Sequence, residues 1–193
     1  AGLGRFEDAI PIYDKLIESS PDDAKIWAYR AYTLNAMGRY EEGLSSAEKS
    51  LAIDPRNGIA WNNKGSALSS LGRYADALDA YNKSVEITPG NSIAWTNKGY
   101  ILSSMGNYEQ ALDAYNKSLE LNPLQPTVWG YRASVLVQLS RYEEAIVAAD
   151  TALLIDPSSS WALNAKGDAA MGLKKYGEAA TAYREALTLN PSS

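Results

Sequence analysis

Apolar residues along this chain recur at steps of three and four, the spacing that places them on one side of an α-helix. Prolines interrupt these stripes every 34 residues, at Pro21, Pro55, Pro89, Pro123, Pro157 and Pro191. Because proline cannot continue the hydrogen-bond ladder of a helix, each of them predicts a helix end. The pattern predicts an all-α chain of short helices with no β-sheet.

Aromatic residues keep the same 34-residue step. One tryptophan stands six residues after each of the first four prolines, at Trp27, Trp61, Trp95 and Trp129. A second aromatic column runs through Phe6, Tyr40, Tyr74, Tyr108, Tyr142 and Tyr176. Residues 58–91 and 92–125 are identical at 21 of 34 positions. A fixed period of this length indicates a solenoid of repeated helical hairpins.

If each proline is numbered 32 within its repeat, the pattern resembles the tetratricopeptide repeat (TPR) over the whole chain. The second full repeat carries the expected residues at positions 4, 8, 11, 17, 20, 24, 27 and 32: Trp61, Gly65, Leu68, Tyr74, Ala77, Tyr81, Ser84 and Pro89. A partial repeat, 1–23, holds the end of a first helix and a whole second helix, and full repeats follow at 24–57, 58–91, 92–125, 126–159 and 160–193. The resemblance implies one solenoid over 1–193: a right-handed superhelix of antiparallel helix pairs, with about 5.5 repeats and eleven helices.

Several residues depart from the repeat pattern. Glycine at position 15 suits a left-handed helix cap, but Ser140 and then Lys174 replace it. Lys174 pays about 1 kcal/mol in that conformation, so we expect its corner to differ. Pro11 is expected to bend the first second-helix. Gly130 is expected to leave a notch. Trp161 stands two residues before the usual aromatic site, and we expect it to point toward the groove rim.

In the TPR family the first helices line a concave groove, and ligand contacts come mostly from positions 2, 5, 6, 9, 12 and 13. Here those positions are rich in amides, hydroxyls and tyrosines, which donate and accept hydrogen bonds and offer rigid apolar area. The resemblance therefore implies a candidate peptide-binding set of Tyr29, Tyr32, Asn35, Asn62, Asn63, Ser66, Asn97, Tyr100, Ser104, Tyr131, Ser134, Gln138, Asn164 and Asp168.

Asn63 and Asn97 share position 6 in consecutive repeats. This resembles a short piece of the asparagine ladder in the TPR region of O-GlcNAc transferases, which grips peptide backbone amides. The alternative is that both are plain polar surface of closely duplicated repeats. The tyrosines of the set likewise fit either groove contact or packing between repeats.

Position 7 is basic in every full repeat, at Arg30, Lys64, Lys98, Arg132 and Lys166. Long basic side chains can pack their aliphatic stems between helices while the charged heads reach outward. Polar groups on the preceding second helices, such as Asn82, Asn116 and Asp150, are placed to receive them. The other interpretation is a basic ladder for an acidic partner, and we favour packing because the column follows the repeat.

The composition and charge of the chain disfavour several classes of function. The net charge of −5 disfavours a nucleic-acid partner, because an acidic chain repels phosphates. The chain has no cysteine and no histidine, and it carries no phosphate loop, dinucleotide motif or metal-ligand cluster. We therefore expect no catalysis, no metal, no cofactor and no membrane span, and a cytoplasmic location.

These observations favour a non-catalytic scaffold that binds a peptide or protein segment in its groove. Two alternatives remain: a structural, self-assembling spacer, and the substrate-recruiting arm of a larger enzyme such as a glycosyltransferase. We expect the chain to be a piece of a longer solenoid. Its uncapped ends would then offer apolar residues for self-association, at Phe6, Ile10 and Tyr13, and at Ala180, Tyr183 and Leu187.

Overall fold

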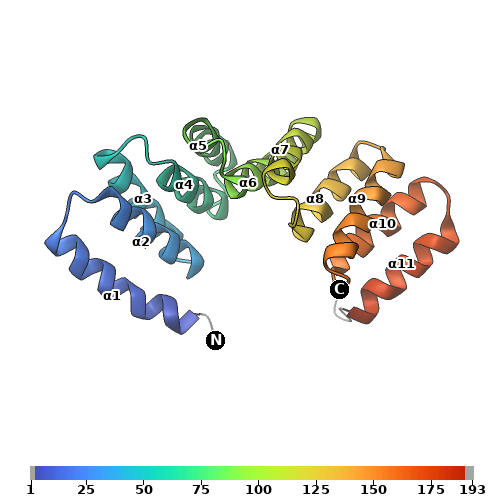
Figure 1. Cartoon of the computed structure of the whole chain (residues 1–193), viewed down its shortest axis with the longest axis horizontal. Coiled ribbons are helices and arrows are strands. Elements are labelled where there is room, and N and C mark those ends of the chain that lie inside the picture. The colour runs from blue at the N-terminus through green and yellow to red at the C-terminus, as the bar shows by residue number, and fades with distance from the viewer. Residues whose placement is uncertain (1–2, 190–193) are drawn as a thin grey trace. The chain divides into compact units, whose positions relative to one another are not determined.

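The structure is a computed structural model that describes residues 3–189, and Figure 1 shows their helices. Eleven helices and no strand lie within this range, which confirms the all-α prediction and its helix count. Their bounds are α1 Leu3–Ser19, α2 Ala24–Ala36, α3 Tyr40–Ile53, α4 Gly58–Ser70, α5 Tyr74–Ile87, α6 Ser92–Ser104, α7 Tyr108–Leu121, α8 Pro126–Gln138, α9 Tyr142–Ile155, α10 Ser160–Gly172 and α11 Tyr176–Leu189. None of the described helices is both long and apolar enough to cross a membrane.

The helices form two compact units, residues 1–97 and 98–193, with the boundary inside α6. We call α2, α4, α6, α8 and α10 the first helices, and the odd-numbered ones the second helices. In the first unit α2 packs on α3 and α4 on α5, while α3 and α2 both contact α4. In the second unit α8 packs on α9 and α10 on α11, while α9 and α8 both contact α10. Helix pairs therefore stack in chain order within each unit. One continuous solenoid stays a prediction.

A hydrogen bond explains why tryptophan follows proline by six residues. The indole Nε1 of Trp27 donates to the carbonyl of Pro21 at 2.9 Å, and that of Trp61 to Pro55 at 2.9 Å. Trp95 and Trp129 make the same bond at 2.8 Å. The bond ties the start of each first helix to the loop before it. It also satisfies a polar group on an otherwise apolar anchor.

Glycines at position 8 make room for tyrosine rings at position 24 of the same repeat. A Cβ added at Gly65 would lie 2.7 Å from Cε1 of Tyr81, which is far inside van der Waals contact. The same close approach joins Gly167 to Tyr183, at 2.5 Å. This confirms that the small residues allow the paired helices to pack closely.

The corner between first and second helix uses the left-handed conformation in every full repeat. Gly38, Gly72 and Gly106 have φ values of 78°, 76° and 79°. Ser140 and Lys174 keep the same corner with φ of 58° and 61°. The expectation that the Lys174 corner differs is therefore wrong. Two hydrogen bonds, from the N–H groups of Lys174 and Lys175 to the preceding helix, hold the turn in shape.

The N-terminal segment differs from the expected end of a first helix followed by a second helix. Helix α1 runs without a break from Leu3 to Ser19 and passes through Pro11. Gly4, at the corner position, is helical, because glycine accepts the helical conformation as well as the left-handed one. That expectation is wrong for residues 3–5. The bend at Pro11 stays a prediction, and Pro191 lies outside the described residues.

Candidate functional site

Two asparagines in the first unit bridge the neighbouring first helices α2 and α4. Asn63 is only 3% exposed, and its Nδ2 donates to the backbone carbonyl of Ala28 at 2.8 Å. In the opposite direction, Nδ2 of Asn35 donates to the backbone carbonyl of Asn63 at 2.8 Å. Buried polar groups need such partners. Both amides therefore hold one repeat to the next, and Asn63 has almost no surface for a ligand.

Asn97 follows the same register with a different partner. Its Nδ2 donates to Oδ1 of Asn62 at 3.1 Å, and both side chains are half-buried. In both repeats position 6 thus reaches position 5 of the preceding repeat. The recurring asparagine has a packing explanation, which is distinct from both a peptide-gripping ladder and plain polar surface. Ser66, also half-buried, forms a hydrogen bond with Tyr81, and burial raises the pKa of the Tyr81 phenol while this bond lowers it.

Two tyrosines of the first unit remain on the surface. Tyr29 and Tyr32, both on α2, are about half exposed. A groove of about 300 Å³ lies beside Tyr29, and Lys25, Arg56 and Ile59 help to line it. These residues provide an apolar floor with two cationic groups at the loop edge of the first helices.

The second unit carries a row of aromatic side chains, which we call the aromatic row: Tyr100, Tyr131 and Trp161. The ring centroids of Tyr100 and Tyr131 are 6.0 Å apart, and those of Tyr131 and Trp161 are 5.8 Å apart with perpendicular planes. Tyr115 supports the row from behind, with its centroid 5.8 Å from that of Tyr131. Burial, and then the neighbouring Tyr100, raises the pKa of Tyr131. Contacts between aromatic rings stabilise a particular ring geometry, in addition to the stabilisation that comes from burying apolar surface area.

Trp161 and Gly130 explain each other. A Cβ added at Gly130 would lie 3.2 Å from Cδ1 of Trp161, so the indole fills the notch that glycine leaves. The indole Nε1 donates to Oγ of Ser134 at 3.0 Å, and the Ser134 hydroxyl donates to the carbonyl of Gly130 at 3.1 Å. The expected open notch is therefore occupied. Trp161 is still 57% exposed, and it belongs with the candidate residues although the position pattern left it out.

The remaining candidate residues of the second unit differ in their exposure and in whether their side chains already form hydrogen bonds. Gln138 is exposed and Asn164 is half-buried. The Ser104 hydroxyl donates to the backbone carbonyl of Tyr100 at 2.9 Å. Asp168 accepts a hydrogen bond of 2.6 Å from the phenol of Tyr183. Burial, followed by this contact with the carboxylate, raises the pKa of Tyr183 to about 12.

Family models of the tetratricopeptide repeat match the chain along most of its length. The matches cover residues 1–57 and 34–92, then 92–123, and finally 160–193. The chain belongs to the tetratricopeptide repeat family. No curated protein matches its sequence significantly.

Solved TPR structures share the fold. Pseudomonas aeruginosa pilF has a TM-score of 0.85 at 26% identity, covering 98% of this chain and 86% of that one. YrrB, described as a TPR protein with an unusual peptide-binding site, has a TM-score of 0.79 at 20% identity and covers 93% of each chain. MamA has a TM-score of 0.77 at 20% identity, covering 89% of this chain and 93% of that one. At sequence identities this low, the structural similarity establishes only that these proteins share the TPR architecture.

The basic column at position 7 of the TPR pairs with the second helix of the preceding repeat. In each case for which the structure gives a contact with the preceding second helix, the partner stands 16 residues earlier; Arg30 also donates to Oγ of Ser46, on α3 of its own repeat, at 2.8 Å. The pairs are Arg30 with Asp14 at 3.0 Å, Lys64 with Glu48 at 3.0 Å, Arg132 with Asn116 at 2.8 Å, and Lys166 with Asp150 at 2.7 Å. Asn116 and Asp150 thus receive cations as expected. These contacts support the packing interpretation of the column.

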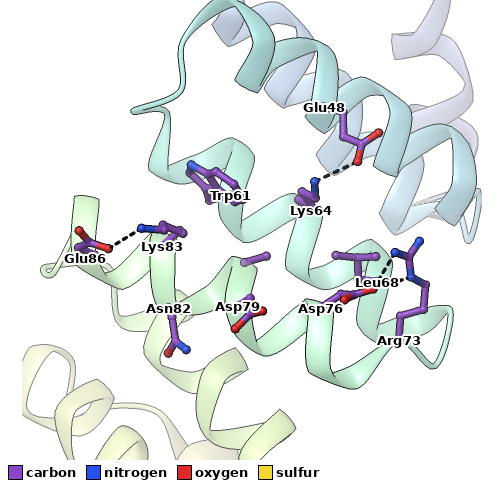
Figure 2. A pocket seen from close by; sticks show the side chains of 11 residues that line it. Glu48, Trp61, Lys64, Leu68, Arg73, Asp76, Asp79, Asn82, Lys83 and Glu86 are labelled. Atoms are coloured by element: carbon purple, nitrogen blue, oxygen red, sulfur yellow. Dashed lines mark hydrogen bonds and ion pairs between the residues drawn. The ribbon is translucent and has the colours of Figure 1, made fainter.

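Figure 2 shows the surroundings of one member, Lys64, in a groove of about 550 Å³ on the side of the second helices. Its ammonium lies 5.6 Å from the centre of the Trp61 ring, and Glu48 reaches it from α3. The other two cations in the groove, Arg73 and Lys83, also have carboxylate partners. Three of the four carboxylates that line this groove thus hold its three cations, and Asp79 leaves an excess of one negative charge.

The arrangement of these side chains suits binding. Among residues 3–189 no cluster of acidic side chains could hold a metal ion. The aromatic row and its neighbours present apolar faces, hydroxyls and amides. Groups of this kind recognise a polypeptide by shape and hydrogen bonding.

Proposed function

We propose that this chain is a non-catalytic scaffold that binds a peptide or protein segment on the face of its first helices. The aromatic row of the second unit is the observation that carries the proposal. Tyr100 and Trp161 remain about half exposed although their rings are fixed by Tyr131. Fixed aromatic side chains bind at low entropic cost, and truncating them typically costs about 2 kcal/mol or more.

The surroundings of the row suggest an uncharged stretch of polypeptide as the ligand. Tyr100, Gln138 and Asn164 offer hydrogen-bonding groups, while Asp168 is the one carboxylate among the candidates. The peptide-binding site named for YrrB supports the proposal by analogy of fold. In the first unit, Tyr29 and Tyr32 form a candidate surface of that unit's own, whereas Asn63 acts in packing and is left out of it.

A panel of fluorescent 12-residue peptides tests the proposal. We expect members of the panel to bind the chain, and Tyr100→Ala and Trp161→Ala each to weaken that binding by roughly 30-fold, the equivalent of about 2 kcal/mol. Tyr176→Ala is the matched control, because Tyr176 is an equally exposed aromatic residue on second helix α11. Peptide binding that survives both substitutions, or falls equally with Tyr176→Ala, contradicts the proposal.

A second candidate function is self-association through α11. Leu187 and Ala180 lie exposed on this helix, while Tyr183 is half-buried and bonded to Asp168. At the other end Ile10 is buried and Phe6 and Tyr13 are half-buried, which weakens the case for an N-terminal contact. Sedimentation of the wild type beside Leu187→Glu tests this role. A single monomeric species for both proteins would rule it out.

The alternative of a substrate-recruiting arm stays a proposal of the same binding surface in a larger protein. The absence of cysteine suits a reducing compartment, and a cytoplasmic location stays a prediction. The acidic charge of the chain supports a protein partner over a nucleic acid.

A further inference from the structure

The outer face of second helix α9 carries two large apolar residues where the other second helices of the full repeats carry polar, charged or small ones. Positions 22, 26 and 29 carry Asp, Lys and Glu in both α5 and α7. The lysine and glutamate pair on the helix surface, at 3.2 Å between Lys83 and Glu86 and 2.8 Å between Lys117 and Glu120. In α9 the same positions hold Val147, Thr151 and Leu154. We call these three residues the α9 strip.

The α9 strip is open to solvent. Val147 is 64% exposed and Leu154 is 85% exposed. The residues lie four and seven positions apart, so they share one side of the helix. The Thr151 hydroxyl donates to the carbonyl of Val147 at 2.8 Å, which satisfies the only side-chain polar group of the strip. An isolated exposed leucine is ordinary, but here a charged surface has been exchanged for an apolar one in a single repeat.

The charges beside the strip all have one sign along the helix. α9 carries Glu143, Glu144 and Asp150, and none of its residues is basic. Glu144 pairs with Arg141 in the preceding loop, and Asp150 pairs with Lys166 on α10. Glu143 is exposed near the start of the helix. A ligand that lies along α9 thus meets an apolar strip flanked by three carboxylates, of which two already hold one cation each, so the flanks keep an excess of negative charge at Glu143.

We propose that the α9 strip is a second interaction surface, which binds an amphipathic helix of another protein with an apolar stripe and basic flanks. Leucine-like side chains spaced three, four and seven apart would cover Val147 and Leu154, and lysine or arginine would meet the carboxylates. A second copy of this chain fits less well, because two α9 helices would bring six carboxylates together against only the four cations, Arg141 and Lys166 of each copy, that already pair with them. An anionic membrane is disfavoured by the same charges.

The binding experiment uses the whole chain and three fluorescent 18-residue helical peptides. The first has leucines along one face and lysines elsewhere, the second has glutamates in place of the lysines, and the third is the first with its order scrambled. The key variant is Val147→Asp, Thr151→Lys and Leu154→Glu together, which restores the residues that α7 carries. Because α7 folds with these residues, the variant is expected to keep the fold. Ile12→Asp, on another exposed apolar residue, is the matched control.

The key variant also separates apolar docking from simple charge attraction. It adds two negative charges and one positive charge, so attraction of a lysine-rich peptide by net charge alone would increase. We expect the opposite: binding of the first peptide at least about ten-fold weaker than in the wild type, with Ile12→Asp unchanged. We also expect the glutamate peptide and the scrambled peptide to bind the wild type at least about ten-fold more weakly than the first.

Hydrogen exchange locates the bound peptide. The amides of residues 142–155 are expected to gain protection with the first peptide, while those of α8 and α10 stay unchanged. Three results overturn the proposal: equal or tighter binding by the key variant, protection confined to the first helices, or a wild-type dimer in sedimentation that the key variant dissociates. The last result would identify a second copy as the occupant.

Discussion

Replacing Lys174 by glycine is expected to stabilise the chain, although it removes a side chain. Lys174 sits in the left-handed conformation with φ of 61°, where a Cβ costs an L-residue about 1 to 2 kcal/mol. Glycine adopts this conformation without strain, but the greater conformational entropy of glycine in the unfolded chain reduces the gain in stability by about 0.4 to 1 kcal/mol. The Lys174 side chain is exposed and takes part in no hydrogen bond or ion pair among the described residues, so the expected net gain is about 0.5 to 1 kcal/mol.

Urea unfolding followed by circular dichroism measures this gain as a higher midpoint with an unchanged slope. Lys174→Ala is the matched control, because alanine removes the charge and keeps the Cβ, and its midpoint is expected to stay near that of the wild type. Gly72→Lys makes the reverse exchange at φ of 76°, where an added Cβ meets no atom within 4 Å. It is expected to destabilise by a similar amount. Stabilisation by the alanine variant as well would assign the effect to charge and refute the backbone explanation.

Three further predictions use contacts of the first helices, either with each other or with the second helix of the same repeat. Asn63→Ala is expected to destabilise by about 1 kcal/mol, because it removes a buried hydrogen bond between neighbouring repeats, whereas Asn97→Ala, at a half-buried site, should cost less; urea unfolding of both ranks them. Gly43→Ala is expected to lower the urea midpoint, because its Cβ would fall 2.0 Å from Oδ1 of Asn35 and displace that amide. Tyr183 ionises with a raised pKa of about 12, so its contribution to stability is full below pH 10 and is lost between pH 10 and 12. Ultraviolet titration of the wild type beside Tyr183→Phe checks this pKa, and a Tyr183 phenol that titrates near pH 10 contradicts it.

The fold could be predicted from the sequence because the residues that recur in each repeat make contacts that also recur. The step of six between proline and tryptophan reports the bond from Trp61 to Pro55. The glycine at position 8 reports the approach of Tyr81. The corner at Lys174 could not be predicted in this way, since the two hydrogen bonds that hold the turn come from backbone groups, which any residue supplies. Local preference gave way there to the geometry that stacking requires.

The candidate site was harder to predict, because position alone does not separate packing from binding. Asn63 and Asn97 stand on the helix face that contacts ligands in the family, yet their amides turn toward the preceding first helix. Tyr131 occupies the same position and does the same with a larger side chain, packing on Tyr100. A residue at position 6 is therefore drawn into the interface between repeats by the stacking itself. Its polarity carries little information about a ligand.

Departures from the repeat carry more of that information. A residue that recurs is explained by stacking, which every repeat must achieve, whereas a residue found in one repeat needs another cause. Gly130 and Trp161 depart in adjacent repeats and fit each other, and together they leave an indole exposed beside Tyr131. Val147 and Leu154 depart within one helix and replace an ion pair that two sister helices keep. In α9 an exposed apolar group in place of a charged one does not improve stacking, which is why we propose a partner for the α9 strip as well as for the aromatic row.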